Sequence, residues 1–322
     1  MTRPKIALLS TGGTIAMTAA TGAGASLAFG AAHLAETAAG MAVDLVARDV
    51  LAKSSSSFSL TDLGTIAHAA LDAAADADGV VITHGTDTLE ETALALALLV
   101  RSQTPVVLTA AMRRPDQPGA DGPANLVAAM RVAASPAARG LGVLVVMDDE
   151  IHCGPLVRKT HSFRTHAFSS APFGPIGWIA EDRVRIALAP RLSLPALDYG
   201  GGTPVVPILE AGNGLEPSLI DALLPVSDGL VVALPGAGHV AAGAVDALAA
   251  FAATKPVVFA SRTGQGETLR HSYGFGGGEM ELIARGVIPA GPLDSRKSRI
   301  LLQLLIADGI STDRIRAAFA AL

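Results

Sequence analysis

Two glycine turns in this sequence carry threonines that could act as nucleophiles. They are Thr11-Gly12-Gly13-Thr14 and His84-Gly85-Thr86-Asp87-Thr88, and each follows a short apolar run. Thr14 comes directly after the glycines, where converging main-chain N–H groups could stabilise an oxyanion beside its hydroxyl. In the second turn, Thr86 and Asp87 place a hydroxyl and a carboxylate side by side. Both turns could equally be tight connections between elements, with the carboxylate as an ordinary helix cap.

A threonine hydroxyl is a weak nucleophile and needs a base within hydrogen-bond reach. Lys159 is a candidate, because burial lowers the pKa of a lysine while a carboxylate such as Asp87 would hold its side chain in place. Nothing in its local sequence requires burial. On the sequence alone, a surface lysine is the better interpretation of this residue.

Other potential ligands and nucleophiles give weaker patterns. Residues 148–153, followed by His161 and His166, hold many metal-capable groups, but their spacing matches no zinc or six-coordinate pattern, so no metal is expected. Cys153 and His152 are adjacent, and neighbours on a strand point to opposite faces, which favours a structural cysteine. Residues 234–240 follow a strand as a dinucleotide turn would, but lack the third glycine. A dehydrogenase is therefore a low-ranking alternative, and no cofactor is expected.

The elements that must position the two turns alternate between strands and helices. Buried strands are predicted at Ile6 to Leu9, Val80 to Thr83, Val106 to Thr109 and Val143 to Met147, and helices begin near Leu60, Leu89 and Pro123. This alternation predicts an α/β fold with a mainly parallel sheet that is covered on both faces. Both turns then fall at the carboxyl ends of strands, where open parallel sheets bind ligands.

A stretch rich in proline and glycine divides the chain. We predict a larger N-terminal domain at residues 1–190, a linker at 191–206 and a smaller C-terminal α/β domain at 207–322. Three further strands are expected in the second domain, with a helix near Ser295 to Ile306. They span Val205 to Leu209, Leu230 to Leu234 and Val257 to Ala260.

Composition limits the class of protein. The 322 residues are 50% hydrophobic, enough to bury a sizeable core, and the net charge is −5 with no basic stripe, so nucleic acid is not an expected partner. Apolar stretches are too short for a membrane span, and one cysteine allows no intrachain disulfide. No signal peptide is visible at the start. A cytoplasmic location is favoured, and a periplasmic one stays open.

Taken together, the two turns resemble the paired signatures of bacterial-type L-asparaginases. The first signature extends over residues 11–16 and the second over residues 81–92. The similarity continues through Ala111-Met112-Arg113, Ala120-Asp121-Gly122-Pro123, Lys159-Thr160 and Gly174-Pro175-Ile176-Gly177, and then through the second domain to Lys297. It covers essentially the whole chain.

The resemblance implies a role for each matched residue. Thr14 would attack the side-chain amide of L-asparagine and form an acyl-enzyme, which water then hydrolyses to L-aspartate. Thr86, Asp87 and Lys159 would form a second catalytic cluster that handles protons and water. Asp87 would also hold the α-ammonium group of the substrate, and Ser55 its α-carboxylate. Neither metal nor organic cofactor is implied.

Glu279 is the residue through which the resemblance implies an oligomer. Counted back from Lys297, it matches a family glutamate that reaches into a neighbouring subunit's site to hold the substrate's ammonium group. A homotetramer of intimate dimers is then expected. Without the family, Glu279 after the glycine-rich residues 274–278 would be interpreted as a solvated residue on a mobile loop.

Three features depart from the family pattern. Residues 17–30, where a lid is expected to close over Thr14, contain no tyrosine. Ser56, assigned to the substrate site, stands where many relatives carry glutamine. His239 stands where an asparagine of the second subunit is expected. The predicted activity is hydrolysis of a linear amide C–N bond in L-asparagine. Its alternatives are a mixed glutaminase-asparaginase and a non-catalytic protein that binds acidic amino acids.

Overall fold

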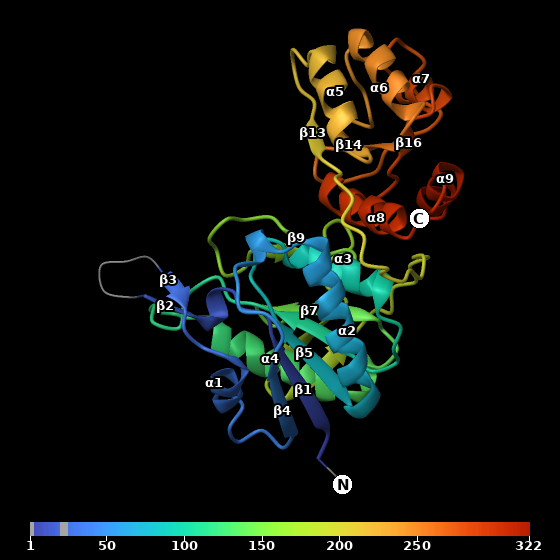
Figure 1. Cartoon of the computed structure of the whole chain (residues 1–322). Helices are drawn as coiled ribbons and strands as arrows, with labels where there is room; N and C mark the ends of the chain where they lie inside the picture. The colour runs from blue at the N-terminus through green and yellow to red at the C-terminus, as the bar shows by residue number, and fades with distance from the viewer. Residues whose placement is uncertain (1–2, 20–24) are drawn as a thin grey trace. The chain divides into compact units, whose positions relative to one another are not determined.

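The computed structural model of the chain describes residues 3–19 and 25–322, which divide into two compact units, Met1–Arg191 and Leu192–Leu322 (Figure 1). The last strand of the first unit ends at Ile186 and the first strand of the second begins at Ile208. All residues between them are described, and none belongs to a helix or strand. The expected linker lies within this stretch.

One eight-stranded sheet forms the centre of the first unit. In chain order its strands are β1 (Lys5–Ser10), β4 (Asp44–Asp49), β5 (Gly79–Thr83), β6 (Val106–Thr109), β7 (Val143–Met147), β8 (Glu150–Cys153), β11 (Gly177–Ala180) and β12 (Arg183–Ile186). They lie in the order β12-β11-β8-β7-β6-β5-β1-β4. The five strands from β7 to β4 are parallel, whereas β8, β11 and β12 extend the sheet antiparallel. The predicted α/β fold with a mainly parallel sheet is confirmed.

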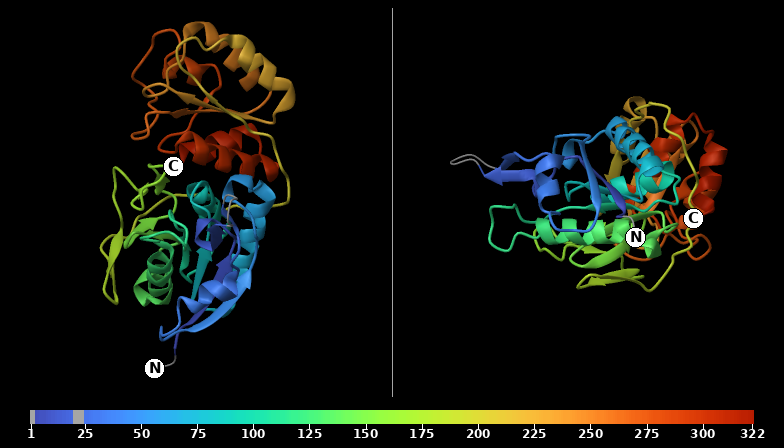
Figure 2. Two further views of the ribbon diagram at one scale, coloured as in Figure 1. Left: turned by 90° about the vertical axis from the view of Figure 1, so that its left-hand side faces the viewer. Right: turned by 90° about the horizontal axis from the view of Figure 1, so that it is seen from below.

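Helices cover both faces of this sheet (Figure 2). They are α1 (Ala31–Glu36), α2 (Leu60–Asp76), α3 (Leu89–Leu99) and α4 (Gly122–Ala134), with one-turn 3-10 helices at Thr14–Ala16, Ser55–Ser57 and Pro136–Ala138. One core joins α4 to inward residues such as Leu8 and Val81. The alternate strand residues Val80 and Ile82 are equally buried, since a second layer of helices packs on the other face.

Helix α3 is enclosed on nearly all sides. Ten of its residues are buried, and they include Glu90, Glu91 and Thr92. The N-cap residue Thr88 forms no side-chain cap and instead donates its hydroxyl to the carbonyl of Ser55 at 2.9 Å. The polar residues at the start of α3 therefore make contacts to other segments.

The second unit has a smaller, fully parallel sheet in the order β13-β14-β15-β16. The strands are β13 (Ile208–Glu210), β14 (Leu230–Leu234), β15 (Val257–Ser261) and β16 (Ile288–Pro289). The helices are α5 (Pro217–Leu223), α6 (Val245–Ala252), α7 (Glu279–Ala284), α8 (Ser295–Ala307) and α9 (Thr312–Ala320), with 3-10 turns at Leu224–Val226 and Ala242–Ala244. Its own hydrophobic core includes Val232, Leu248 and Phe259.

Two short hairpins lie outside the sheets. Strands β2 (Met17–Ala19) and β3 (Ala25–Leu27) pair within the expected lid, of which residues 20–24 lie outside the described residues. Strands β9 (Arg158–Lys159) and β10 (Phe168–Ser169) form a second pair that carries Lys159. Lid closure stays a prediction.

Within the described ranges, no helix combines the length and apolar character that crossing a bilayer requires.

Candidate active site

The two threonine turns lie side by side because β1 and β5 are adjacent parallel strands. Ser10 is in register with Thr83, so the turns leave the sheet at the same level. Thr11 then ties the first turn to the end of β5, since both its main-chain N–H and its hydroxyl donate to the carbonyl of Thr83, at 3.1 and 2.8 Å. The sequence places each turn at a strand end, and the sheet order brings them together.

Glycine is required where the turns meet. Gly13 has a φ of 86°, and a Cβ built on it would lie 2.5 Å from the main-chain nitrogen of Gly85. A Cβ on Gly85 would in turn lie 2.5 Å from Oγ of Ser55. Because a side chain at either position would collide with its neighbour, the two turns and Ser55 pack without intervening atoms.

The predicted catalytic and substrate-binding residues around this junction differ in exposure. Thr14 begins the 3-10 turn Thr14–Ala16 and is half-buried. Ser55 is 2% exposed, whereas Ser56 is exposed and its Oγ lies 2.9 Å from that of Ser54. Ser55 is therefore next to the second turn, whereas Ser56 is hydrogen-bonded to Ser54.

Lys159 reaches the second turn through its side chain. Its Nζ donates to Oγ1 of Thr86 at 2.9 Å and to Oδ1 of Asp87 at 2.7 Å. The lysine side chain is 15% exposed, and Thr86 is 6% exposed. Lys159 is thus not the surface lysine that its local sequence favours. A hydroxyl, an ammonium group and a carboxylate in contact can pass a proton between the threonine and a bound molecule.

The ring of His84 links the second turn to α3. Its Nδ1 lies 2.6 Å from the carbonyl oxygen of Gly85, and its Nε2 lies 2.9 Å from Oγ1 of Thr92 on α3. Burial lowers the pKa of this imidazole to about 4, so the ring is neutral near pH 7. A neutral ring with its proton on Nδ1 donates to Gly85 and accepts from Thr92. The turn is therefore fixed to the helix that follows it.

This burial predicts a loss of stability in acid. The unfolded-state pKa is near 6.5 and the folded-state value is about 4, so at pH values between them the unfolded chain binds more protons. Stability is therefore fully present above pH 6.5 and falls as the pH approaches 4. For His84 we expect the free energy of unfolding to drop by about 2 kcal/mol from pH 7 to 4.5.

Urea unfolding at the two pH values measures this effect. His84→Gln should show a smaller drop than the wild type, while His33→Gln, at an exposed histidine, should leave it unchanged. An identical drop in wild type and His84→Gln would show that this imidazole does not titrate on unfolding.

Glu279 and His239 form a separate polar pair in the second unit. Glu279 begins α7 and is fully buried, so its interpretation as a solvated residue is wrong. Its Oε1 accepts main-chain N–H groups from Ser272 and Tyr273 at 2.7 and 2.8 Å. Burial pushes the pKa of this carboxyl up, but the N–H donors of Tyr273 and Ser272 outweigh it and hold the pKa below its usual value. Glu279 is therefore ionised.

The second oxygen of Glu279 is left for another partner. Oε2 lies 3.6 Å from Nε2 of His239, and within the described residues neither of these buried atoms has a hydrogen bond. The imidazole makes edge-on contacts with the rings of Tyr273 and Phe275, with centroids 4.6 and 5.1 Å away. A buried carboxylate oxygen without a donor is costly unless it binds a cation or another donor.

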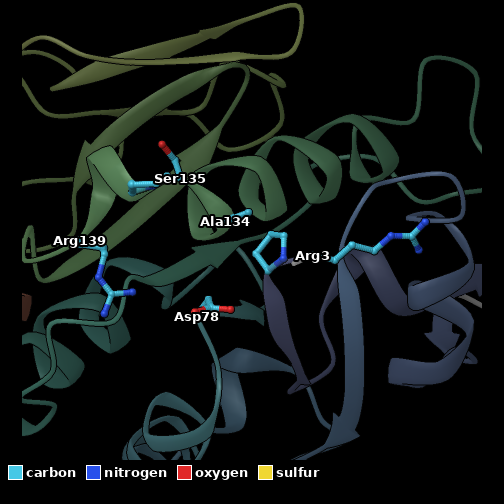
Figure 3. A pocket seen from close by; sticks show the side chains of 7 residues that line it. Arg3, Asp78, Ala134, Ser135 and Arg139 are labelled. Carbon is cyan, nitrogen blue, oxygen red and sulfur yellow. The ribbon is translucent and has the colours of Figure 1, made fainter. Parts of the chain in front are cut away.

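A cavity elsewhere in the first unit is less suited to chemistry. A cavity of about 290 Å³ lies where β1 and β5 begin, and there the side chain of Arg139 extends toward Asp78 (Figure 3). It is at the opposite ends of these strands from the threonine turns. Across the described part of the chain, no cluster of three or more His, Cys, Asp or Glu residues could hold a metal.

The local sequence indicates neither that His84 ties the second turn to α3 nor that Glu90 accepts the main-chain N–H of Lys159 at 2.6 Å. Both residues lie inside the second signature, residues 81–92. The available signal is the pair of adjacent glutamates Glu90 and Glu91 in a helix whose other residues are mostly apolar. The group that Glu90 contacts, at Lys159, lies far away in the sequence.

Comparisons with known proteins find similarity to asparaginases in both units. A family model described as "Asparaginase, N-terminal" matches residues 5–191, and one described as "Glutaminase/Asparaginase C-terminal domain" matches residues 205–319. A probable L-asparaginase of Deinococcus radiodurans is 40% identical over 261 residues, which cover 79% of each chain. L-asparaginase 2 of Escherichia coli is 34% identical, with 75% of this chain and 70% of that protein covered.

A solved structure shows the same similarity in three dimensions. The crystal structure of a probable cytoplasmic L-asparaginase from Campylobacter jejuni superposes with a TM-score of 0.89 at 30% identity. The match covers 99% of this chain and all of that one (100%). The agreement therefore extends over both units.

Proposed function

The chain belongs to the asparaginase family, and from this premise we propose that it hydrolyses L-asparagine to L-aspartate and ammonia through a threonyl ester. The observation that carries the proposal is the junction of the two threonine turns, with Lys159 in hydrogen-bond contact with Thr86 and Asp87. Such a junction offers a nucleophile and a proton-handling cluster on neighbouring strands.

In the proposed reaction, Oγ1 of Thr14 attacks the side-chain amide carbon of the substrate. The hydroxyl proton passes to the catalytic cluster, and a proton returned to the amide nitrogen lets ammonia leave. Water then adds to the ester, and its proton restores the Thr14 hydroxyl as L-aspartate departs. Thr86 and Lys159 relay these protons, because Nζ of Lys159 is 2.9 Å from Oγ1 of Thr86.

Three residues serve substrate binding in this proposal. Asp87, whose side chain is 62% exposed, can accept the α-ammonium group while its Oδ1 keeps Lys159 in place. Ser55 lies against the second turn and can donate to the α-carboxylate. Ser56 lies beside it on an exposed surface and would contact the substrate only at the edge of the site.

The assay for the proposal is release of ammonia and L-aspartate by the purified protein. L-Glutamine is measured in parallel, since one methylene is worth only about 1 to 3 kcal/mol of discrimination and a mixed glutaminase-asparaginase is the first alternative. Comparable kcat/KM values for the two amides would favour that alternative. Tight binding of asparagine or aspartate with no turnover at any pH would favour a non-catalytic binding protein instead.

We further propose a homotetramer of intimate dimers, in which Glu279 of one chain enters the site of another. The support is its ionised, buried carboxylate, whose Oε2 has no hydrogen-bond donor among the described residues and suits an ammonium group. Sedimentation measures the assembly state. Cell fractionation tests the cytoplasmic location that we propose alongside it.

Glu279→Gln should raise KM for asparagine roughly 10- to 100-fold, because a charged hydrogen bond to the ammonium group is lost. The effect on kcat should be smaller, since Glu279 does not face the reacting amide in this proposal. Steady-state kinetics separates the two constants.

Mixed oligomers decide whether the site is shared between chains. Glu279→Gln chains refolded together with Thr14→Ala chains should regain low-KM activity, because some sites then combine an intact Thr14 with an intact Glu279. If mixing gives only the sum of the two separate activities, the site belongs to one chain and the shared arrangement is wrong.

A further inference from the structure

Glu90 makes a buried contact to the main chain of Lys159. It is the second residue of α3 and is 1% exposed. Its Oε2 accepts the main-chain N–H of Lys159 at 2.6 Å, across 69 positions of sequence. A carboxylate accepting from an N–H group forms a shorter and stronger hydrogen bond than a neutral acceptor does. The start of α3 also favours a negative charge at this place.

The side chain of Lys159 returns to the same segment. Its Nζ donates to Thr86 and Asp87 in the turn that precedes α3, while its main-chain nitrogen donates to Glu90 in the first turn of that helix. Residues 86–90 therefore bind both the main-chain nitrogen and the side-chain Nζ of this lysine. The position of Nζ relative to Thr86 depends on where the main chain of Lys159 is held.

The strand that carries Lys159 gives it little support by itself. Strand β9 has two residues and pairs with the two residues of β10, with one more main-chain bond from Thr160 to Ala167 at 2.7 Å. A two-stranded pair of this length is not stable alone. Contacts to the rest of the unit must therefore fix it, and the hydrogen bond from the main-chain N–H of Lys159 to Glu90 is one of them.

We propose that Glu90 is a positioning residue for the reaction: it fixes the main chain of Lys159 so that Nζ stays within hydrogen-bond distance of Thr86. This inference rests on the proposed function, in which Lys159 and Thr86 relay protons. The role depends on the reach of the acceptor oxygen. Glutamine keeps that reach without the charge, whereas aspartate keeps the charge but withdraws the oxygen by one methylene.

The test compares Glu90→Gln with Glu90→Asp on L-asparagine. Glu90→Gln should stay within a few-fold of the wild-type kcat, whereas Glu90→Asp should lower kcat roughly 10- to 100-fold with KM nearly unchanged, because small displacements of catalytic groups are costly. Asp228→Asn in the second unit is the matched control, since its carboxylate also accepts a main-chain N–H, from Val205 at 2.8 Å. It should leave kcat unchanged.

Amide hydrogen exchange supplies a readout that does not need turnover. Exchange at Lys159 should be faster in Glu90→Asp than in the wild type and nearly unchanged in Glu90→Gln. Wild-type exchange and wild-type kcat in Glu90→Asp would overturn the inference, as would a larger kcat loss in Glu90→Gln. If the wild type itself releases no ammonia, the proposed function fails, and the exchange rates still decide whether Glu90 holds Lys159.

Discussion

Replacing Thr14 with alanine is expected to lower kcat for L-asparagine by about 10⁴-fold or more, the range seen when a hydrolase loses its nucleophile. Alanine removes the only group of this residue that can form the threonyl ester, while the half-buried position should tolerate the smaller side chain. Ammonia release measured over long incubations gives the residual rate. Thr14→Ser should retain part of the activity, because it keeps a hydroxyl at the same place.

Two controls separate loss of chemistry from loss of structure. Thr37→Ala changes another half-buried threonine, at the end of α1 outside both turns, and should leave kcat near the wild-type value. L-Aspartate should still raise the melting temperature of Thr14→Ala, since the binding residues remain. Undiminished turnover by Thr14→Ala would rule out this residue as the nucleophile.

Replacing Lys159 with methionine should lower kcat roughly 10²- to 10⁴-fold, the range typical of lost proton transfer. Methionine approaches the length of lysine but carries no proton for Thr86, and it leaves Asp87 without the ammonium group that is 2.7 Å away. Rapid-quench kinetics, with mass spectrometry of the protein, shows which half-reaction is slowed. An accumulating acyl-enzyme would place the main effect on hydrolysis of the ester.

Lys255→Met is the matched control for this substitution. Lys255 is also partly buried, and its Nζ donates to the carbonyl groups of Leu224 and Ser227 in the second unit. Its loss should lower stability and leave kcat for the folded protein unchanged. A Lys159→Met protein that turns over asparagine at the wild-type rate would remove Lys159 from the proposed relay.

Local sequence patterns determined several of the strands and helix starts of this protein. The apolar runs of β5, β6 and β7 and the start of α3 at Leu89 are where the sequence predicts them, because continuous β-branched runs and a glycine turn before a helix are short-range signals. The edge strand β4 was not predicted, since charged and exposed residues interrupt its apolar pattern. The antiparallel strands β11 and β12 were not predicted either. Pairing with a neighbour defines them, because their own patterns are weak.

The two threonine turns were visible in the sequence, and their contact was not. The sequence by itself determined that Thr14 and Thr86 each follow a strand, because that placement depends only on adjacent residues. Only the tertiary structure decided that Gly13 meets Gly85, that Lys159 is held between Glu90 and Thr86, and that Glu279 is buried beside His239. These contacts depend on strand order and on the packing of helices across tens of residues, which no local pattern records.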